Sequence, residues 1–432
     1  MPMNNMRSLT KNLKKISQNR GIHGVSYVPQ KLQGISFAGR ETASPTGSLS
    51  VVVRAGSRYQ PDAGVAHLLE KFAFKNTEDR SALRITRESE LLGGQLSTQL
   101  TPEHIILTAR FLNEYMEYYA RLLAEVVDAS QYLGFQYKEE VLPAAKLESS
   151  LWKGNPMNVA MAKLHEKAFH RGLGDLPYLP LGANASISQI TDYAKAAYVK
   201  SNFSVVSSGP DVQKAADTVA KYFSVVRDGN PLPTAPTKVA SGESRIYSSK
   251  PMNHFLLGFP TNTAPSAELY VLSSILGGRP SVKWSHGNSL LAKASEKASE
   301  FKATAAANLH PYTDASLLSI VVSGTCPKSI KATASESVQA LKSLTSSIPV
   351  ETIKAAVADA KTKYLSSYEP SVLNPVSTTS LFATNYQPEP FISALDAVTP
   401  ESVAKTASTL LSRPASTVAV GKLNHLPYYD EL

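Results

Sequence analysis

Short apolar segments separated by turn residues occur along the whole 432-residue chain and predict two sets of β-strands. In the first half, segments rich in β-branched and apolar residues predict strands at 32–39, 47–56, 95–100, 104–111 and 202–208. In the second half, the same pattern predicts strands at 245–249, 255–259, 301–309, 316–323 and 417–420. Strands are therefore expected in both halves of the chain rather than in one block.

Apolar residues at helical spacing predict helices between these strands. A helix is expected over 65–72, where Val65, Leu68, Leu69 and Phe72 form one apolar face. A second helix over 81–92 ends at the breaker Gly93-Gly94. Longer helices are expected at about 115–126, 139–152, 157–169 and 188–200 in the first half, and at 266–276 and from 328 onward in the second. This alternation of strands and helices indicates two halves that each combine both kinds of element.

The order of elements repeats after a linker. Residues 228–243 are rich in proline, glycine, serine and threonine and have almost no large apolar residues, which predicts an exposed linker. The stretch 258–265 runs from a glycine to a proline and leads into a helix, as does the stretch 56–61 about 200 residues earlier. We therefore expect two similar domains, at 25–227 and 244–432.

The net charge of +9 is concentrated at the amino terminus. Residues 1–40 contain seven Lys and Arg residues, and the first acid is Glu41, so the rest of the chain is nearly neutral. A basic, acid-free terminus is typical of a mitochondrial transit peptide, which we predict over residues 1–24. A disordered basic arm that binds an acidic surface is the alternative. The nearly neutral remainder argues against a nucleic-acid partner.

Two further features of the sequence argue against a membrane-spanning segment and against a structure built on cysteines. No apolar run approaches the roughly 20 residues that are needed to span a bilayer. The chain has one cysteine, Cys326, which excludes an internal disulfide framework and any metal site built from several cysteines.

The pattern that carries chemical information is His67-x-x-Glu70, on the predicted helix over 65–72. A histidine and a glutamate at i and i+3 share one helical face, as the inverted zinc motif H-x-x-E-H requires. The next position should hold the second histidine ligand, but it is Lys71, whose ammonium group has no lone pair for a metal. Taken alone, the pattern also fits a hydrogen-bonded interior histidine beside solvated helix residues.

The surrounding sequence adds a series of landmarks. In chain order they are Gly56-Ser57-Arg58, Pro61, Gly64, Phe74-Lys75-x-Thr77, Leu164-His165, Leu181-Gly182, Ile187-x-x-Ile190 and Tyr198-x-x-x-Asn202-Phe203. Together with the motif, this series resembles the pitrilysin/insulinase-type metallopeptidase family over nearly the whole chain. The resemblance implies an α+β fold of two similar domains, each with a mixed, mostly antiparallel sheet packed with several helices.

In that family two histidines and a distant glutamate bind zinc, and the glutamate inside the motif activates water as a general base. The resemblance places His67 at the first ligand, Glu70 at the base and Glu148 at the distant ligand. Lys71 replaces the second ligand, so we expect no catalytic residue, no metal and no hydrolysis. In place of the metal we expect a Lys71–Glu148 ion pair. Loss of either member would leave a buried unpaired charge and cost about 3–5 kcal/mol.

Three functions compete within this family, and Lys71 argues against the first, an active peptidase. The second, a non-catalytic substrate-binding subunit of the mitochondrial processing peptidase, would have a glycine-rich loop after Gly277-Gly278. Residues 277–289 contain only three glycines and include the bulky Trp284. We therefore expect the third function, a non-catalytic structural core subunit of the respiratory ubiquinol–cytochrome c reductase (complex III).

That role implies core protein 1, cytochrome b and other subunits of a dimeric complex III as partners. The expected location is the matrix side of the mitochondrial inner membrane, with attachment through partners only. The expected contribution is to assembly and stability. No cofactor is expected, because the sequence has no haem or iron–sulfur ligation pattern.

Overall fold

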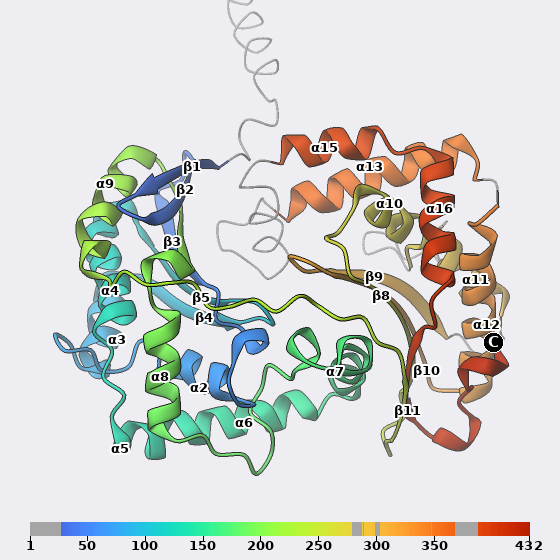
Figure 1. Cartoon of the computed structure of the whole chain (residues 1–432), viewed down its shortest axis with the longest axis horizontal. Helices are drawn as coiled ribbons and strands as arrows, with labels where there is room; N and C mark the ends of the chain where they lie inside the picture. Colours follow the sequence, from blue (N-terminus) through green and yellow to red (C-terminus); the bar gives the residue numbers. More distant parts are fainter. Residues whose placement is uncertain (1–26, 279–286, 288, 299–302, 347, 368–387) are drawn as a thin grey trace, which may run out of the picture.

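The computed structural model describes residues 27–278, 287, 289–298, 303–346, 348–367 and 388–432 (Figure 1). The transit peptide predicted over residues 1–24 lies outside these residues, as does the region around Trp284. The described elements form two halves, each a sheet packed with helices. The predicted α+β class is therefore confirmed.

The first half contains a six-stranded sheet with the strand order β1-β2-β6-β3-β5-β4. Its strands are β1 (Val28–Leu32), β2 (Ile35–Glu41), β3 (Thr46–Val53), β4 (Gln95–Leu100), β5 (Ile105–Leu112) and β6 (Phe203–Gly209). β2 and β6 are parallel, and the other neighbouring strands are antiparallel. The single strand predicted over 32–39 is instead a hairpin, because Gln33 and Gly34 turn the chain with φ values of 49° and 91°.

The second half contains a five-stranded sheet with the order β7-β11-β8-β10-β9. Its strands are β7 (Glu243–Tyr247), β8 (Asn253–Thr261), β9 (Thr304–Pro311), β10 (Ser316–Gly324) and β11 (Ser416–Gly421). β7 and β11 are parallel, and the other pairs are antiparallel. This order matches β2-β6-β3-β5-β4 strand by strand, including the one parallel pair, so the predicted duplication is confirmed.

The helices agree with the predicted positions, with two additions. In the first half they are α2 (Val65–Phe72), α3 (Ala82–Leu91), α4 (Met116–Asp128), α5 (Gly134–Gln136), the π-helical η4 (Tyr137–Val141), α6 (Leu142–Lys153), α7 (Pro156–Phe169), α8 (Ile187–Ala197) and α9 (Val212–Tyr222). In the second half they are α10 (Ala267–Leu276), α11 (Leu290–Lys297), α12 (Pro327–Ser343), α13 (Val350–Ser366), α15 (Glu389–Asp396) and α16 (Pro400–Leu411). The additions are α9 and α11, whose buried faces consist largely of alanine.

Short 3-10 turns connect many of these elements. They are η2 (Ser57–Tyr59), η3 (Asn113–Tyr115), η5 (Gly172–Gly174), η6 (Lys200–Asn202), η7 (Phe223–Val225), η8 (Leu423–His425) and η9 (Tyr429–Glu431). Within the described residues, none of the helices combines the length and the apolar character that a membrane-spanning helix needs.

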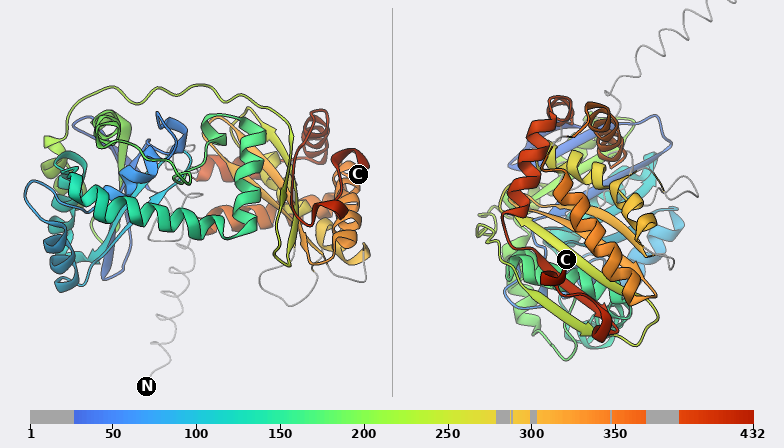
Figure 2. Two further views of the ribbon diagram at one scale, coloured as in Figure 1. Left: turned by 90° about the horizontal axis from the view of Figure 1, so that it is seen from below. Right: turned by 90° about the vertical axis from the view of Figure 1, so that its right-hand side faces the viewer.

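Each sheet packs one face against helices of its own half and the other face against helices of the opposite half. Leu164 of α7 lies in one apolar cluster with Leu256 and Val418 of the second sheet. In return, Tyr364 of α13 lies in one cluster with Val52 of the first sheet. Figure 2 shows α6 running from the first half toward the second, where α7 lies against the sheet. Each half therefore supplies a helix that covers one face of the sheet in the other half.

The predicted linker crosses the molecule as an extended strap (Figure 2). Residues 228–242 contain no helix or strand, and most of their side chains are exposed. The strap is nevertheless held in place, because the N–H of Ala240 donates to the carbonyl of Ala168 at 2.8 Å.

Arg58 ties the two halves and the strap together. Its guanidinium donates to both carboxylate oxygens of Asp314, at 2.6 and 2.7 Å, and to the carbonyl of Ala235 at 2.9 Å. It also lies 3.0 Å from Glu103. The side chains of Arg58 and Glu103 are only 4% and 2% exposed. Because Asp314 lies in the turn between β9 and β10, this landmark arginine acts as a link between the halves.

Candidate metal centre

Helix α2 carries three of the four residues of the predicted site, and a glycine at its start sets its position. Gly64 has a φ of 91°, and an added Cβ would lie 2.4 Å from Cδ1 of Leu179. A glycine is therefore required where the chain enters the helix beside this loop. The side-chain oxygen of Gln60 accepts hydrogen bonds from the N–H groups of Gly64 and Ala66, at 3.0 and 3.3 Å, and caps the helix.

His67 is fully buried and uses both of its ring nitrogens. Nε2 lies 3.0 Å from Oε2 of Glu148 on α6, and Nδ1 accepts a hydrogen bond of 3.1 Å from the N–H of Leu179. The ring of Tyr178 packs edge-on against the imidazole, with the ring centroids 5.1 Å apart. The site therefore contains a hydrogen-bonded interior histidine, as the bare motif also allowed.

Glu70 is almost as deeply buried, with 3% of its side chain exposed. Its Oε1 accepts a hydrogen bond from the hydroxyl of Thr98 on β4, and its Oε2 lies 3.1 Å from Nζ of Lys71. A buried carboxylate needs such partners, because an unpaired charge in the interior is costly. A solvated helix residue is therefore the wrong description of Glu70.

Lys71 forms the ion pair with Glu148 that the sequence predicts. Its Nζ lies 2.5 Å from Oε2 of Glu148. Burial lowers the pKa of Lys71, but the charge of Glu70 and the hydrogen bonds to both carboxylates outweigh burial and raise it. The hydrogen bond from His67, together with that from Lys71, lowers the pKa of Glu148 to about 2.

The predicted burial of this pair is wrong for Glu148. Its side chain is 40% exposed, and that of Lys71 is 23% exposed. Solvent screening limits the free energy of such a pair to about 1 kcal/mol, well below the cost of about 3–5 kcal/mol expected for a buried one. The deeply buried charge is Glu70, and Lys71 is its cationic partner.

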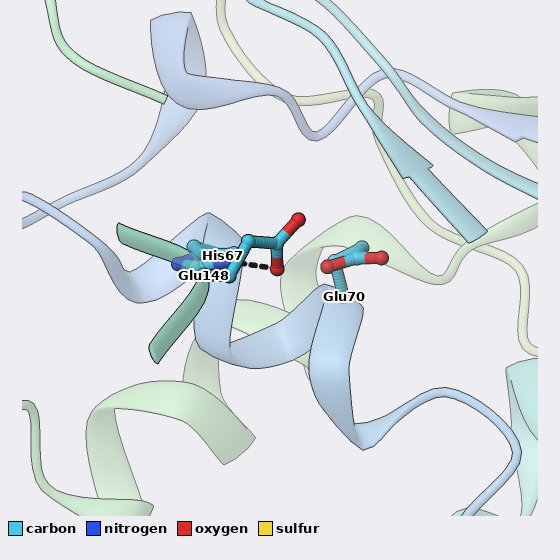
Figure 3. Close-up of side chains that lie close together, drawn as sticks. All are labelled: His67, Glu70 and Glu148. Atoms are coloured by element: carbon cyan, nitrogen blue, oxygen red, sulfur yellow. Dashed lines mark hydrogen bonds and ion pairs between the residues drawn. The ribbon is translucent and has the colours of Figure 1, made fainter. Parts of the chain in front are cut away.

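The donor atoms of His67, Glu70 and Glu148 converge, and all lie within 4.8 Å of one another (Figure 3). A catalytic zinc ion needs three protein donors at about 2 Å and an open position. Here the ammonium of Lys71 bridges the two carboxylates, and Nε2 of His67 is already bonded to Glu148. As arranged, these side chains do not fit a zinc ion.

The sequence motif does not predict three of the contacts at the site. They come from the hydroxyl of Thr98, the ring of Tyr178 and the amide of Leu179. The loop with Tyr178 and Leu179 lies directly before the landmark Leu181-Gly182, and this proximity is the only hint that the sequence offers.

Comparisons with known proteins agree with the fold and the motif. The family model described as Insulinase (Peptidase family M16) matches residues 38–176, which include α2 and α6. A curated protein of Schizosaccharomyces pombe, named cytochrome b-c1 complex subunit 2, mitochondrial, is 67% identical over 428 residues. The alignment covers 99% of this chain and 100% of that protein. The chain belongs to the family of this cytochrome b-c1 complex subunit 2 protein.

More distant relatives carry the same name. The cytochrome b-c1 complex subunit 2 of Neurospora crassa is 36% identical over 425 residues, with 94% of this chain and 91% of that protein covered. The human protein of the same name is 26% identical over 444 residues, with 97% and 96% covered. The match to the insulinase family model confirms the family resemblance that the motifs indicated.

A solved structure shows the same fold at low sequence identity. The crystal structure of a protease from Helicobacter pylori superimposes with a TM-score of 0.80 and covers 92% of this chain and 99% of that chain. The identity is 15%, so the likeness concerns the fold alone.

Proposed function

We propose that this chain is the non-catalytic core protein 2 of the mitochondrial ubiquinol–cytochrome c reductase. Its role is assembly and stability of the complex at the matrix side of the inner membrane. The position of Lys71 carries the proposal, because its ammonium bridges Glu70 and Glu148 where the peptidase fold would hold its metal. The chain is also 67% identical to a protein named as subunit 2 of the cytochrome b-c1 complex.

The lack of hydrolysis follows from the partners of Glu70. A metallopeptidase base takes a proton from a water molecule that a metal ion has made more acidic. Glu70 instead accepts a hydrogen bond from Thr98 and pairs with Lys71. Because these two contacts engage its carboxylate, Glu70 is not free to take a proton from a water molecule. Any peptide processing in the assembled complex has to use a site on a partner.

The proposed partners are core protein 1, cytochrome b and the other subunits of the dimeric complex, and attachment to the membrane occurs through them. Helix α6 supports an assembled state. Leu147 and Leu151 lie one turn apart on its outer side and are 62% and 70% exposed. Large apolar side chains grouped on a surface are typical of a face that a partner covers.

Size fractionation tests the proposal. Mitochondrial membranes from cells that express a tagged full-length chain are solubilised in mild detergent, and the companions of the chain are identified by mass spectrometry. Co-migration with cytochrome b and the Rieske protein is the expected result. Recovery in a soluble heterodimer with a zinc-containing subunit would contradict it and favour the substrate-binding subunit of the processing peptidase. Bound zinc and peptide cleavage by the purified chain would contradict it in favour of an enzyme.

A further inference from the structure

We infer that a second feature, independent of Lys71, keeps His67 from binding zinc: the N–H of Leu179 fixes the imidazole proton on Nε2, the nitrogen that faces Glu148. This inference rests on the proposed non-catalytic function and deepens it. It means that replacing Lys71 by histidine is not enough to restore a metal site, because the loop 176–180 opposes the metal as well.

The direction of one hydrogen bond determines where the proton lies. A backbone amide can only donate, so Nδ1 of His67, which lies 3.1 Å from the nitrogen of Leu179, has to accept. The neutral ring then has its only hydrogen on Nε2, and this N–H donates to Oε2 of Glu148 at 3.0 Å. A doubly protonated ring does not fit, because its Nδ1–H would point at the N–H of Leu179.

Zinc requires the opposite arrangement. A zinc ion beside the carboxylates would bind a lone pair on Nε2, which this tautomer does not have. Histidines that bind zinc donate their other ring N–H to an acceptor, and Leu179 offers a donor in that place. Turning the ring over would remove both hydrogen bonds of a fully buried side chain. Binding would therefore need the loop to withdraw or the neutral ring to lose its single N–H proton and become an imidazolate.

The loop is held firmly in this position. Leu179 is 1% exposed, and its Cα would lie only 2.9 Å from a Cβ added to Gly64. The loop backbone thus touches the first turn of α2 directly. Tyr178 packs edge-on against the ring of His67, and a proline lies on either side of the Tyr178-Leu179 pair. Moving the amide away would disturb the start of the helix that carries the site.

Zinc titration of the full chain by calorimetry is the first test, with Lys71→His compared with Lys75→His. The control adds one histidine four residues further along the chain, outside the site. We expect Lys71→His to bind zinc no more than about 100-fold more tightly than the control, because a wrong partner for a ligating histidine removes about 10–100-fold of the affinity that the added ligand supplies. One zinc ion per chain, bound more than about 100-fold more tightly than in the control, would overturn the inference.

Removal of the amide hydrogen is the second test. Leu179→Pro has no N–H at this position, so the double variant Lys71→His/Leu179→Pro is expected to bind zinc about 10–100-fold more tightly than Lys71→His alone. A folded double variant with no gain would contradict the inference.

Nitrogen NMR of the unmodified chain gives a readout that needs no change in the loop, and it decides the case if the proline variant does not fold. The chain is labelled with ¹⁵N-histidine, and His67→Gln identifies the signals of His67. The expected spectrum has a protonated Nε2 and an unprotonated Nδ1. A proton on Nδ1 would overturn the inference.

The two proposals fail in different ways. Zinc bound by the unmodified chain, with peptide cleavage, would refute the non-catalytic function. A zinc-free unmodified chain together with a tightly zinc-binding Lys71→His variant would refute only the role of Leu179.

Discussion

The two halves of the molecule have the same sheet but differ in the helix that follows the second common strand. In the first half this helix is α2, which buries His67 and Glu70. In the second half it is α10, whose buried side chains are all apolar: Ala267, Leu269, Val271, Leu272, Ile275 and Leu276. The fold is therefore compatible with an apolar helix at this place, and the polar cluster is not required to build it.

The comparison also shows how the first half keeps charge in its interior. Glu70 has a cation and a hydroxyl as partners, and His67 has a partner on each nitrogen. Burial of ionised groups is tolerated when each has a partner and becomes strongly destabilising when one partner is removed. Four substitutions test how far stability depends on these partners, and they follow in order from the largest expected change in the free energy of unfolding to the smallest.

Breaking the link between the halves should have the largest effect. Arg58→Ala leaves Glu103, 2% exposed, without its cation and removes the ion pair with Asp314. We expect the free energy of unfolding in urea to fall by about 3–5 kcal/mol. The control is Arg54→Ala, whose hydrogen bond to Thr234 is exposed and whose loss should cost about 0.5 kcal/mol. Equal losses for the two variants would mean that Arg58 does not join the halves energetically.

Removing the cation of the site should come next. Lys71→Met leaves the carboxylate of Glu70 buried with only Thr98 as a partner. A loss of about 2–4 kcal/mol is expected from urea unfolding, somewhat less than for a fully buried pair because Lys71 is 23% exposed. Lys75→Met is the control, since Glu140, the partner of Lys75, is 44% exposed and such a pair contributes less than about 1 kcal/mol. A result for Lys71→Met as small as that of the control would show that Glu70 does not depend on Lys71.

Making the site resemble the apolar second half should restore stability. In Glu70→Gln/Lys71→Met the buried group is neutral and can still accept the hydrogen bond from Thr98. We expect unfolding within about 1 kcal/mol of the unmodified chain, because a neutral replacement removes the cost of a lone charge. A double-mutant cycle with both single variants measures the coupling, and simple additivity of the two losses would contradict the pairing.

The smallest expected effect is the loss of stability in acid through Glu148. The pKa of Glu148 is lowered from 4.5 to about 2, so its contribution to stability is complete above pH 4.5 and is lost as the pH falls toward 2. Because Glu148 is 40% exposed, that contribution stays below about 1 kcal/mol. The difference in unfolding free energy between the unmodified chain and Glu148→Gln should shrink from about pH 5 to about pH 3. A difference that grows over this range would contradict the assigned shift.

Much of the fold could be predicted from the sequence, because strands and amphipathic helices leave a periodic pattern. The strands of both halves except β1, the duplication and helix α2 follow from that pattern. Helices α9 and α11 do not, since their buried faces rely on alanines such as Ala215 and Ala292, which give a weak apolar signal. The covering of each sheet by the other half also leaves no local pattern, because the partners are far apart in the sequence.

The candidate site could likewise be predicted only in part. Side chains with a typical chemical role, His67, Glu70 and Glu148, could be placed by the motif and the family resemblance. The amide of Leu179 could not, because every residue except proline has one and only the path of the chain decides where it points. The degree of exposure of Glu148 is likewise a property of packing, and for this reason the predicted cost of losing its ion pair was too large.

The reciprocal covering of the sheets sets an order for folding during synthesis. Helix α7 is complete by Phe169, but the strand residues that shield its apolar side include Val418 and Val420, almost at the carboxyl end. A growing chain therefore leaves part of this apolar surface of α7 uncovered until β11 has been added, although Leu256 and Leu317 can cover the rest earlier. Truncation before β11 should leave an aggregation-prone polypeptide that chaperones have to retain, even though the whole first half is present.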